Sequence, residues 1–579
     1  MDGNTLRHII GKLQNFCLIE TDRDIIADAF EVFTGYSLKG EQGQFFTPKN
    51  VVRLMVNAVD PNLSDVIIDP SCGSGGFLVE SLKYLWGKVD LEAKELEWED
   101  TAVYEEKKEI GIKNIRGVEK DSFLTKVAKS YMAILGDGKG GIFCEDSLED
   151  PKKWKSKTQQ LIKLESMDIC LANPPFGKDI KITGKEKLSQ YELAKNSNGK
   201  LVSEGNPSTL FFERDLQLLK DGGVLGIILP ETYFHAPSKK SFRDFFKQHN
   251  IKWIIDLPHN TFRPHNNAKC IIIIVQKNTP QQKKINMAVA EYIGHDHTGR
   301  AIYMKEENGN NTDKIQDDIP TIIEEIIRKR NNTFKKVDGK KEYTFEVDAK
   351  DVIEKDIFVP RYYWQSKLKE IETIAKNEKI KLIPLQELLD EKIIETFDGN
   401  GSPNGEFKGQ GEIPYIRVKD IVQWQIYKDP TALIPESEYN RLYKAEKQLK
   451  EKDILYVSRG SYRIGSVAMA SPYDLKCILT REIKVIRLLK QDNKYGITAE
   501  YLLYALSHQL VAAQSHNKVF IDTTLPNIAK RWTEIKIPVF ENVNKFNQIK
   551  ELAKKIVKQQ WNALKEIDYL KKNCDVYNT

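Results

Sequence analysis

Short runs of apolar residues alternate with amphipathic stretches between about residues 41 and 280. In chain order, the apolar runs read "DVIIDP", "IRGVEKD", "GIFCED", "MDICLANPP", "GGVLGIILP", "IKWIIDLP" and "KCIIIIVQK". Continuous apolar strands separated by helices are typical of a parallel sheet that helices cover on both faces. The pattern predicts a doubly wound α/β domain over residues 41–350, with the charge-rich segment 86–112 as a surface insertion.

Two other patterns flank this domain. Before it, "NTLRHIIGKLQNF" and "RDIIADAFEVF" place apolar residues at helical spacing, which predicts a short helical region over residues 1–40. After it, short β-like runs with turns, such as "KDILYVSRGS" and "RIGSVAMAS", predict an α+β domain over residues 351–543.

The last part, residues 544–579, is expected to form a long helix. An apolar stripe runs along it at helical spacing and consists of Ile549, Leu552, Ile556, Ala563, Ile567 and Leu570. The stripe fits a helix packed on its own domain, and it equally fits a coiled-coil arm that pairs with another helix.

Composition narrows the class of protein only in part. The net charge of +5 over 579 residues neither requires nor excludes a nucleic acid, because a sum hides local basic patches. Seven cysteines include no Cys-x-x-Cys pair, so we expect no metal site, no disulfide framework and a reducing, cytoplasmic location. We find no apolar run of membrane-spanning length and no signal-peptide pattern, so no membrane partner is expected.

A glycine-rich turn follows the first strand of the predicted sheet. It reads Asp69-Pro70-Ser71-Cys72-Gly73-Ser74-Gly75-Gly76 and leads into a helix. Glycines in such a turn allow positive φ angles and let the backbone approach a ligand closely. A tight turn without a ligand remains the alternative, because this signal alone is weak.

Acidic residues follow the next two strands and strengthen the ligand interpretation. Glu119 ends the second strand, where a carboxylate can accept hydrogen bonds from two ribose hydroxyls. Asp146 and Ser147 follow the third strand, where an ionised Asp can accept a hydrogen bond from an adenine amino group. Each acid alone is more often an ordinary loop residue, but open α/β sheets bind ligands at these strand ends.

The fourth strand ends in the rigid turn Asn173-Pro174-Pro175-Phe176. Two prolines fix φ and remove backbone donors, so this turn is rich in hydrogen-bond acceptors. The Asn173 side-chain oxygen and the Pro174 carbonyl can converge on an exocyclic amine, and Phe176 offers a flat face for stacking on its heterocycle. A structural Pro-Pro turn is the alternative.

These motifs together resemble a known family. "DPSCGSGGF" with "NPPF" resembles the paired signature of S-adenosylmethionine-dependent amino methyltransferases that act on adenine in DNA. "GQFFTPKNVVRLMV" resembles the first motif of type I restriction-modification modification subunits, and the motif order resembles their gamma arrangement. Similar stretches, "DGGVLGIILPETYF" and "LPHNTFRPHNNAKCIIIIVQ", extend the resemblance over roughly residues 5–330.

The resemblance implies a Rossmann-like, doubly wound methyltransferase domain with S-adenosylmethionine as its cofactor. It implies catalysis by Asn173, Pro174, Pro175 and Phe176. The cofactor residues that it and the strand ends indicate are Phe46, Thr47, Pro48, Asp69, Ser71, Gly73, Gly75, Glu119, Asp146, Ser147 and Asn173.

The α+β region resembles the target-recognition domain of type I specificity subunits, in the stretches "GEIPYIRVKDI" and "EKDILYVSRGSYRIGSV". Such subunits carry two recognition domains, whereas this chain carries one, fused to the methyltransferase. Basic and aromatic residues in its turns suit phosphates and base edges, although each alone is more often a solvated surface residue. The DNA-binding candidates are Arg417, Lys419, Arg459, Tyr462, Arg463 and Lys518.

The leading functional hypothesis is sequence-specific methylation of the adenine N6 amine in double-stranded DNA, with the target base flipped out of the duplex. It belongs in a restriction-modification or related system, with a second copy or with specificity and nuclease subunits as partners. The alternatives are N4-cytosine methylation, RNA or protein amino methylation, and a DNA-binding scaffold without turnover. Carbon-5 cytosine methylation needs a cysteine nucleophile after proline, and the sequence has no Pro-Cys pair.

Overall fold

The computed structural model describes residues 3–14, 47–134, 139–176, 180–196, 198–306, 308–335, 341–460, 462–522 and 525–573. The chain forms two compact units, Met1–Pro360 and Arg361–Thr579. The first unit runs to Pro360, past the predicted boundary at residue 350, because Asp356 pairs with Arg243 and the Phe358 N–H donates to the Phe234 carbonyl. Of the predicted N-terminal helical region, α1 (Gly3–Leu13) is described and helical, and residues 15–40 lie outside the described residues.

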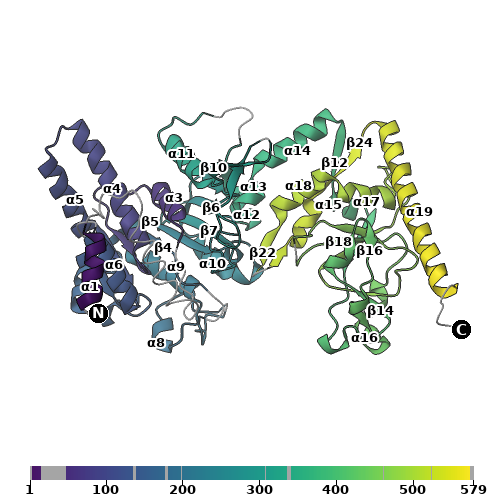
Figure 1. Ribbon diagram of the computed structural model, residues 1–579, viewed down its shortest axis with the longest axis horizontal. Coiled ribbons are helices and arrows are strands. Elements are labelled where there is room, and N and C mark those ends of the chain that lie inside the picture. Colours follow the sequence, from purple (N-terminus) through teal and green to yellow (C-terminus); the bar gives the residue numbers. More distant parts are fainter. Residues whose placement is uncertain are drawn as a thin grey trace. The chain divides into compact units, whose positions relative to one another are not determined.

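The first unit is built on a nine-stranded sheet in the order β11-β8-β6-β7-β5-β4-β1-β2-β3. Its central strands β4, β5, β6 and β7 are labelled in Figure 1. Most neighbouring pairs are parallel, but β7 runs antiparallel to both β5 and β6, and β11 runs antiparallel to β8. The doubly wound α/β architecture is therefore confirmed, whereas the expectation of an all-parallel sheet is wrong. A fully buried strand reads as an apolar run in either direction, so the sequence pattern did not reveal its orientation. The strands are β1 (Ile67–Asp69), β2 (Ile115–Glu119), β3 (Ile142–Cys144), β4 (Met167–Ala172), β5 (Leu219–Pro230), β6 (Asn250–Asp256), β7 (Cys270–Gln276), β8 (Lys284–Val289) and β11 (Thr344–Asp348).

Helices cover both faces of this sheet. After β1 and β2 the chain moves outward toward β3, with α4 packed on β1 and β2 and α6 on β2 and β3. After β4 it moves the other way, with α9 packed on β4 and β5. Because parallel crossovers are right-handed, opposite directions of travel place these helices on opposite faces. The helices of this unit are α1, α3 (Lys49–Val59), α4 (Gly76–Glu95), α5 (Asp100–Asn114), α6 (Ser122–Ile134), α7 (Ser156–Leu161), α8 (Lys185–Leu188), α9 (Pro207–Leu218), α10 (Lys240–Phe246), α11 (Ile319–Arg330) and α12 (Ala349–Lys355).

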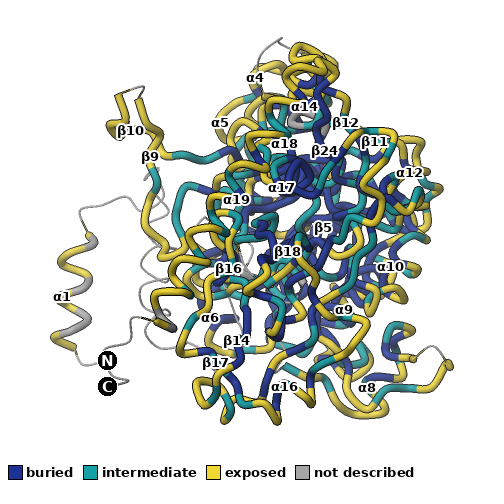
Figure 2. The backbone as a smooth tube through the Cα atoms, turned by 90° about the vertical axis from the view of Figure 1, so that its right-hand side faces the viewer, coloured by how far each residue is buried: buried dark blue, intermediate teal, exposed yellow. Residues whose placement is uncertain are grey.

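The core lies between the sheet and these helices. Central strands such as β5 are buried along most of their length, as the dark tube in Figure 2 shows. The predicted surface insertion at 86–112 falls on the end of α4 and on α5, where Leu91 and Tyr104 are exposed. The hairpin of β9 (Tyr303–Lys305) and β10 (Asn311–Ile315) is likewise exposed (Figure 2).

The strand order reverses between β1 and β4, which are parallel neighbours. Open α/β sheets bind ligands in the crevice at the carboxyl ends of the strands beside such a reversal. The glycine-rich turn follows β1 and the Asn-Pro-Pro-Phe turn follows β4, so the fold brings both to this crevice.

The second unit is α+β. Its main sheets have the orders β13-β21-β18-β19 and β17-β14-β20, with shorter two-stranded ladders beside them. The strands are β12 (Ile380–Pro384), β13 (Ile394–Asp398), β14 (Ile413–Ile416), β15 (Ile421–Val422), β16 (Gln425–Ile426), β17 (Leu433–Ile434), β18 (Ile454–Val457), β19 (Val467–Met469), β20 (Ile478–Leu479), β21 (Ile483–Leu488), β22 (Phe520–Asp522), β23 (Leu525–Asn527) and β24 (Lys536–Phe540). The helices are α14 (Gln365–Asn377), α15 (Leu385–Asp390), α16 (Glu436–Leu442), α17 (Ala499–Ser507), α18 (Gln509–Lys518) and α19 (Val543–Asn573), and α13 (Pro360–Tyr363) lies at the boundary of the units.

The predicted long C-terminal helix is present as α19, but it does not bury the predicted stripe. It packs against α17 and β24 through Phe546, Ala553 and Val557. Leu552 and Leu570 of the predicted stripe are 57% and 55% exposed. The helix therefore packs on its own unit with one face and leaves Leu552, Ile567 and Leu570 of the neighbouring stripe exposed, whereas Ile549 and Ile556 are half-buried. Within the described ranges, no helix is long and apolar enough to cross a membrane.

Candidate donor and catalytic site

The conformation of the turn after β1 is fixed by the backbone angles of its glycines and by hydrogen bonds within the turn. Gly73 and Gly75 have φ angles of 53° and 94°, which residues with a Cβ rarely adopt. The Asp69 carboxylate accepts the Ser71 N–H at 2.9 Å, and the Gly75 N–H donates to the Cys72 carbonyl at 2.7 Å. The predicted glycine-rich turn thus has the geometry that a closely approaching ligand requires.

Sequence reasoning missed a third glycine that this geometry needs. A Cβ on Gly117 of β2 would lie 2.6 Å from Leu78 Cδ1 and 3.1 Å from Cys72 Sγ. The first distance is shorter than real Cβ contacts and the second is tight, so a larger residue at position 117 would require the Leu78 and Cys72 side chains to shift. The Cys72 N–H donates to the Val118 carbonyl at 3.1 Å and fixes that contact.

Glu119 at the end of β2 is tied into the same turn. Its two carboxylate oxygens accept the Gly73 N–H at 2.9 Å and the Asp121 N–H at 2.8 Å. Burial raises the pKa of Glu119, although these backbone hydrogen bonds oppose the shift. Burial also raises the pKa of Asp69 to about 8, with the nearby charge of Glu119 adding to the effect. Two buried acids therefore line the turn, and each oxygen of Glu119 keeps a lone pair for a further donor.

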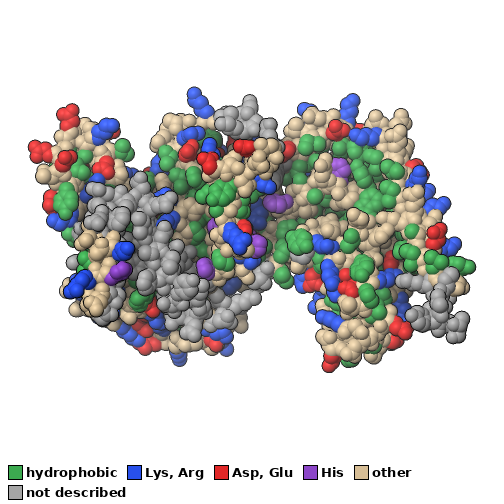
Figure 3. Space-filling model, viewed as in Figure 1, with side chains coloured by type: hydrophobic (Ala, Val, Ile, Leu, Met, Phe, Trp, Pro, Cys, Tyr) green, Lys and Arg blue, Asp and Glu red, His purple; other side chains and the backbone are tan. Residues whose placement is uncertain are grey.

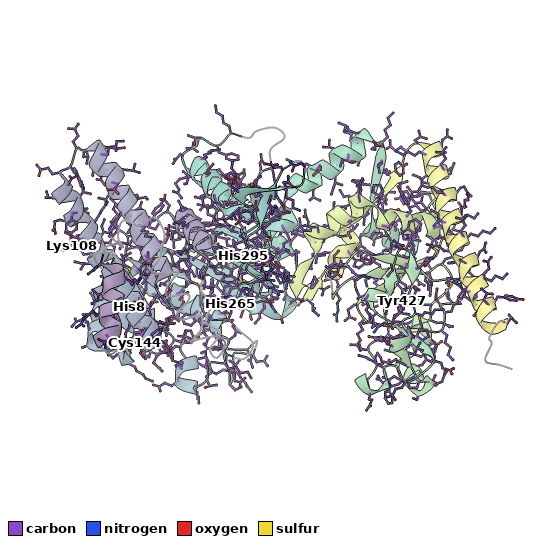
Figure 4. All side chains as sticks on the ribbon, in the orientation of Figure 1. His8, Lys108, Cys144, His265, His295 and Tyr427 are labelled. Carbon is purple, nitrogen blue, oxygen red and sulfur yellow. The ribbon has the colours of Figure 1, made fainter. Side chains whose placement is uncertain are left out.

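The end of β3 brings the third predicted position to the crevice. Cys144, labelled in Figure 4, is the last residue of β3 and precedes Asp146 and Ser147 closely. The Ser147 hydroxyl donates to the Pro70 carbonyl at 2.5 Å and joins this loop to the turn after β1. The Asp146 carboxylate forms ion pairs with Lys187 at 2.9 Å and with Lys120 at 3.0 Å. Neither lysine was predicted from the sequence.

The Asn173 side chain is oriented by a residue far away in the sequence. Its Nδ2 donates to Thr47 Oγ1 at 2.9 Å, across 126 residues. Its Oδ1 is buried and accepts no hydrogen bond from any of the described residues. Thr47 lies just before Pro48 at the start of α3, and Phe46 lies outside the described residues. An unpaired buried acceptor is costly, so this oxygen is a candidate acceptor for a ligand N–H.

The other residues of the Asn173–Phe176 turn are largely shielded from solvent. Pro174 is buried and Pro175 half-buried, and the Phe176 side chain is only 5% exposed. The ring of Phe262, from the segment between β6 and β7, packs edge-on against the Phe176 ring. The expectation that Phe176 offers an open stacking face therefore does not hold in this structure, because aromatic packing between distant segments cannot be read from the turn itself.

Most of the predicted DNA-binding residues already have partners within the second unit. Arg417 contacts Asp420 and Asp429 at 3.0 and 2.5 Å, and Lys419 also contacts Asp429. The remaining basic candidates make the following contacts: Arg459 with Glu482 at 3.3 Å, Lys518 with Glu534 at 2.7 Å, and Arg463 with the Lys419 carbonyl at 2.9 Å.

Tyr462 differs from these candidates because its side chain is 92% exposed. It lies in the loop between β18 and β19, together with Arg459 and Arg463. Tyr427, labelled in Figure 4 and 57% exposed, is a second accessible aromatic residue that the sequence analysis overlooked.

A sheet whose order reverses at β1 and β4, with a glycine-rich turn and acids at successive strand ends, defines the nucleotide-cofactor-binding class of α/β proteins. The family described as N-6 DNA Methylase matches residues 21–371, more than half of the chain. The chain belongs to this family.

Individual curated relatives share only about a quarter of their aligned residues with this chain. The chain is 26% identical over 291 residues to the type I restriction enzyme EcoEI methylase subunit of Escherichia coli, covering 49% of this chain and 52% of that protein. It is 27% identical over 399 residues to the type I restriction enzyme MjaVII methylase subunit of Methanocaldococcus jannaschii, covering 65% of this chain and 59% of that protein. The chain thus spans little more than half the length of these two curated relatives.

A solved structure gives a similar comparison. The methyltransferase subunit of a type I restriction-modification system from Streptococcus thermophilus is 19% identical, with a TM-score of 0.42. The match covers 62% of this chain and 67% of that one.

Proposed function

We propose that this chain is an S-adenosylmethionine-dependent DNA methyltransferase that modifies the N6 amine of adenine. The observation that carries the proposal is the orientation of Asn173. The Thr47 hydroxyl oxygen accepts a hydrogen bond from the Asn173 amide NH2. The amide oxygen therefore points elsewhere and is left to accept a hydrogen bond from an amine. Membership of the N-6 DNA methylase family supports the same chemistry.

The residues around the β1 turn fit the proposed donor. Glu119 would accept hydrogen bonds from the ribose hydroxyls and Asp146 from the adenine amine, while Gly73 and Gly75 would let the donor approach the backbone. Thr47 and Pro48 would border it, as the family resemblance implies for that motif. When bound, the donor supplies an electrophilic methyl group on a sulfonium, which leaves as a neutral thioether.

In the proposed mechanism, the turn after β4 does the positioning. Asn173 Oδ1 and the Pro174 carbonyl accept the two hydrogens of the target amine, which holds its lone pair toward the methyl carbon. These two oxygens also stabilise the positive charge that develops on nitrogen as the new bond forms. The nitrogen then releases its extra proton to water, and no protein acid is needed because the leaving group is neutral. Phe176 would stack on the flipped base once its ring is uncovered.

The second unit carries the surfaces that we propose for binding DNA and a second copy of the chain. We propose that it reads double-stranded DNA through the loop that carries Arg459 and Tyr462. Figure 3 shows hydrophobic side chains on the surface over α19, and the uncovered stripe of Leu552, Ile567 and Leu570 supports pairing with the same helix of a second copy. Relatives named as methylase subunits of restriction enzymes support specificity and nuclease subunits as further partners.

The deciding experiment is mass spectrometry of nucleosides from DNA incubated with the chain and methyl-labelled donor. Labelled N6-methyl-2′-deoxyadenosine is the expected product, and labelled N4-methyl-2′-deoxycytidine would move the proposal to the other exocyclic amine. Label in RNA or protein but not in DNA would overturn it. Binding of DNA without label in any substrate would favour a scaffold.

A further inference from the structure

The segment between the catalytic turn and α9 folds back over the loop that follows β3. Within residues 180–206 it builds a small apolar cluster, in which Leu188, Tyr191 and Ala194 pack against Leu148 and Leu210. Leu188 and Tyr191 are essentially inaccessible to solvent. This segment is therefore a fixed part of the fold beside Asp146.

Hydrogen bonds anchor the segment on both sides. The Tyr191 hydroxyl donates to the Leu148 carbonyl at 2.8 Å and receives Arg214 Nε at 3.0 Å. The Glu213 carboxylate accepts the backbone N–H groups of Glu192 and Leu193 at 2.7 and 2.8 Å. The short helix α8, which carries Lys187, is thereby held against the end of β3.

Lys187 reaches from α8 into the candidate donor site. Its Nζ lies 2.9 Å from Asp146 Oδ2 and 3.4 Å from Glu149 Oε2. Lys120 approaches the same Asp146 oxygen at 3.0 Å, but its side chain is 74% exposed, against 19% for Lys187. An exposed ion pair is screened by water, so Lys187 is the stronger partner.

We propose that Lys187 is a positioning residue of the donor site, which holds the Asp146 carboxylate ionised and oriented toward the 6-amino group of an adenosyl ligand. The inference rests on the proposed function, because the ligand is the proposed methyl donor. The Asp146 carboxylate accepts the Leu148 N–H at 3.1 Å as well as the two lysines. Of about four acceptor positions on a carboxylate, this leaves one for the ligand.

Electrostatics supports this role. Burial alone would raise the pKa of Asp146, but the hydrogen bonds and charges of Lys187 and Lys120 hold it below its ordinary value. An ionised carboxylate only accepts hydrogen bonds, so it favours a 6-amino purine and repels a 6-oxo purine. Lys187 would thus contribute to the choice of base in the donor, which a purely structural lysine would not do.

The test is calorimetric binding of S-adenosylhomocysteine and S-inosylhomocysteine to the full chain. Lys187→Gln should weaken the adenosyl ligand about tenfold, as expected for losing a charge-assisted hydrogen bond. It should change the affinity for the inosyl ligand much less, so that the preference for the adenosyl over the inosyl ligand falls. Lys187→Arg should restore most of the preference. Lys185→Gln, a change at an exposed position of the same helix, is the matched control and should leave both affinities unchanged.

A second variant separates positioning from folding. Asp146→Asn should remove the preference for the adenosyl ligand, and adding Lys187→Gln to it should cost little more, because the two side chains act together. Equal weakening of both ligands by Lys187→Gln, or no weakening, would overturn the inference while leaving the proposed function in place. If the unaltered chain bound neither ligand, the proposed function and the inference would both fail.

Discussion

The ring of Phe262 meets the ring of Phe176 edge-on, with centroids 5.7 Å apart and planes at 81°. Both side chains are buried, at 3% and 5% exposure. Phe262 belongs to the segment between β6 and β7, whose exposed His265 is labelled in Figure 4. The proposed stacking of a flipped base on Phe176 therefore requires the Phe262 ring to move aside.

We therefore predict that hydrogen exchange in residues 257–269 changes when target DNA binds. Amides of that segment should exchange faster in the complex with duplex DNA and S-adenosylhomocysteine than in the free chain, because the segment leaves its contact with Phe176. A duplex with a scrambled site is the control and should leave the exchange as in the free chain. Identical exchange in the free chain and in this complex, with a duplex that the chain does methylate when given the methyl donor, would show that the base does not use Phe176.

The Thr47–Asn173 hydrogen bond makes a second prediction. Asn173→Ala should lower kcat about a thousandfold, since removing one preorganised polar group of this kind costs roughly that much. The dissociation constant for the donor should remain nearly unchanged. Thr47→Val should lower kcat less, because the amide is kept but is free to turn, and Thr47→Ser is the matched control that keeps the hydroxyl. Wild-type turnover in Asn173→Ala would disprove the assigned role.

A third prediction concerns Asp215, whose carboxylate is completely buried and has no hydrogen-bond partner among the described residues. Burial raises its pKa far above the ordinary value, with the nearby charge of Asp69 adding to the shift. The folded chain keeps this proton while the unfolded chain releases it above about pH 4. The free energy of unfolding should therefore fall as pH rises from 5 to 8.

Asp215→Asn removes that titration. Its melting temperature should exceed that of the unaltered chain at pH 8, and the difference should shrink toward pH 5. Scanning calorimetry at the two pH values measures this. A gain that is the same at both pH values would mean that Asp215 is ionised in the folded chain.

The uncovered stripe of α19 makes a fourth prediction. Leu552→Glu combined with Ile567→Glu should convert a dimer into a monomer in light scattering, because a charge in an apolar helix contact is strongly unfavourable. Lys558→Glu, on a different face of the same helix, is the control and should leave the mass unchanged. A monomeric unaltered chain, both free and on DNA, would contradict pairing through this stripe.

The fifth prediction distinguishes DNA-binding candidates that are exposed from those that form ion pairs within the second unit. Tyr462→Ala should weaken DNA binding with little effect on the melting temperature, because the side chain is almost wholly exposed. Arg417→Ala should mainly lower the melting temperature, because it leaves Asp420 and Asp429 without a major partner. Fluorescence anisotropy and thermal unfolding of both variants measure the two effects. If Arg417→Ala weakened DNA binding without loss of stability, its ion pairs would not be structural.

The sequence by itself determined the local features of this protein. The turn from Asp69 to Gly75 and the turn from Asn173 to Phe176 are specified by neighbouring residues, since glycine and proline set backbone angles regardless of what packs around them. Apolar runs of strand length likewise predicted the doubly wound α/β architecture, and the spacing of apolar residues predicted the helix that became α19. These inferences need only interactions within a few residues.

Only the tertiary structure decided which distant residues meet. The direction of β7, the contact of Thr47 with Asn173, the ring of Phe262 on Phe176 and the reach of Lys187 to Asp146 all depend on strand order and helix packing. The same holds for α19, where packing against α17 and β24 buried Ala553 and Val557 and left Leu552 exposed. The chemistry of an apolar or charged side chain is the same in any fold. Which residue it contacts is therefore set by the three-dimensional arrangement and not by its neighbours in sequence.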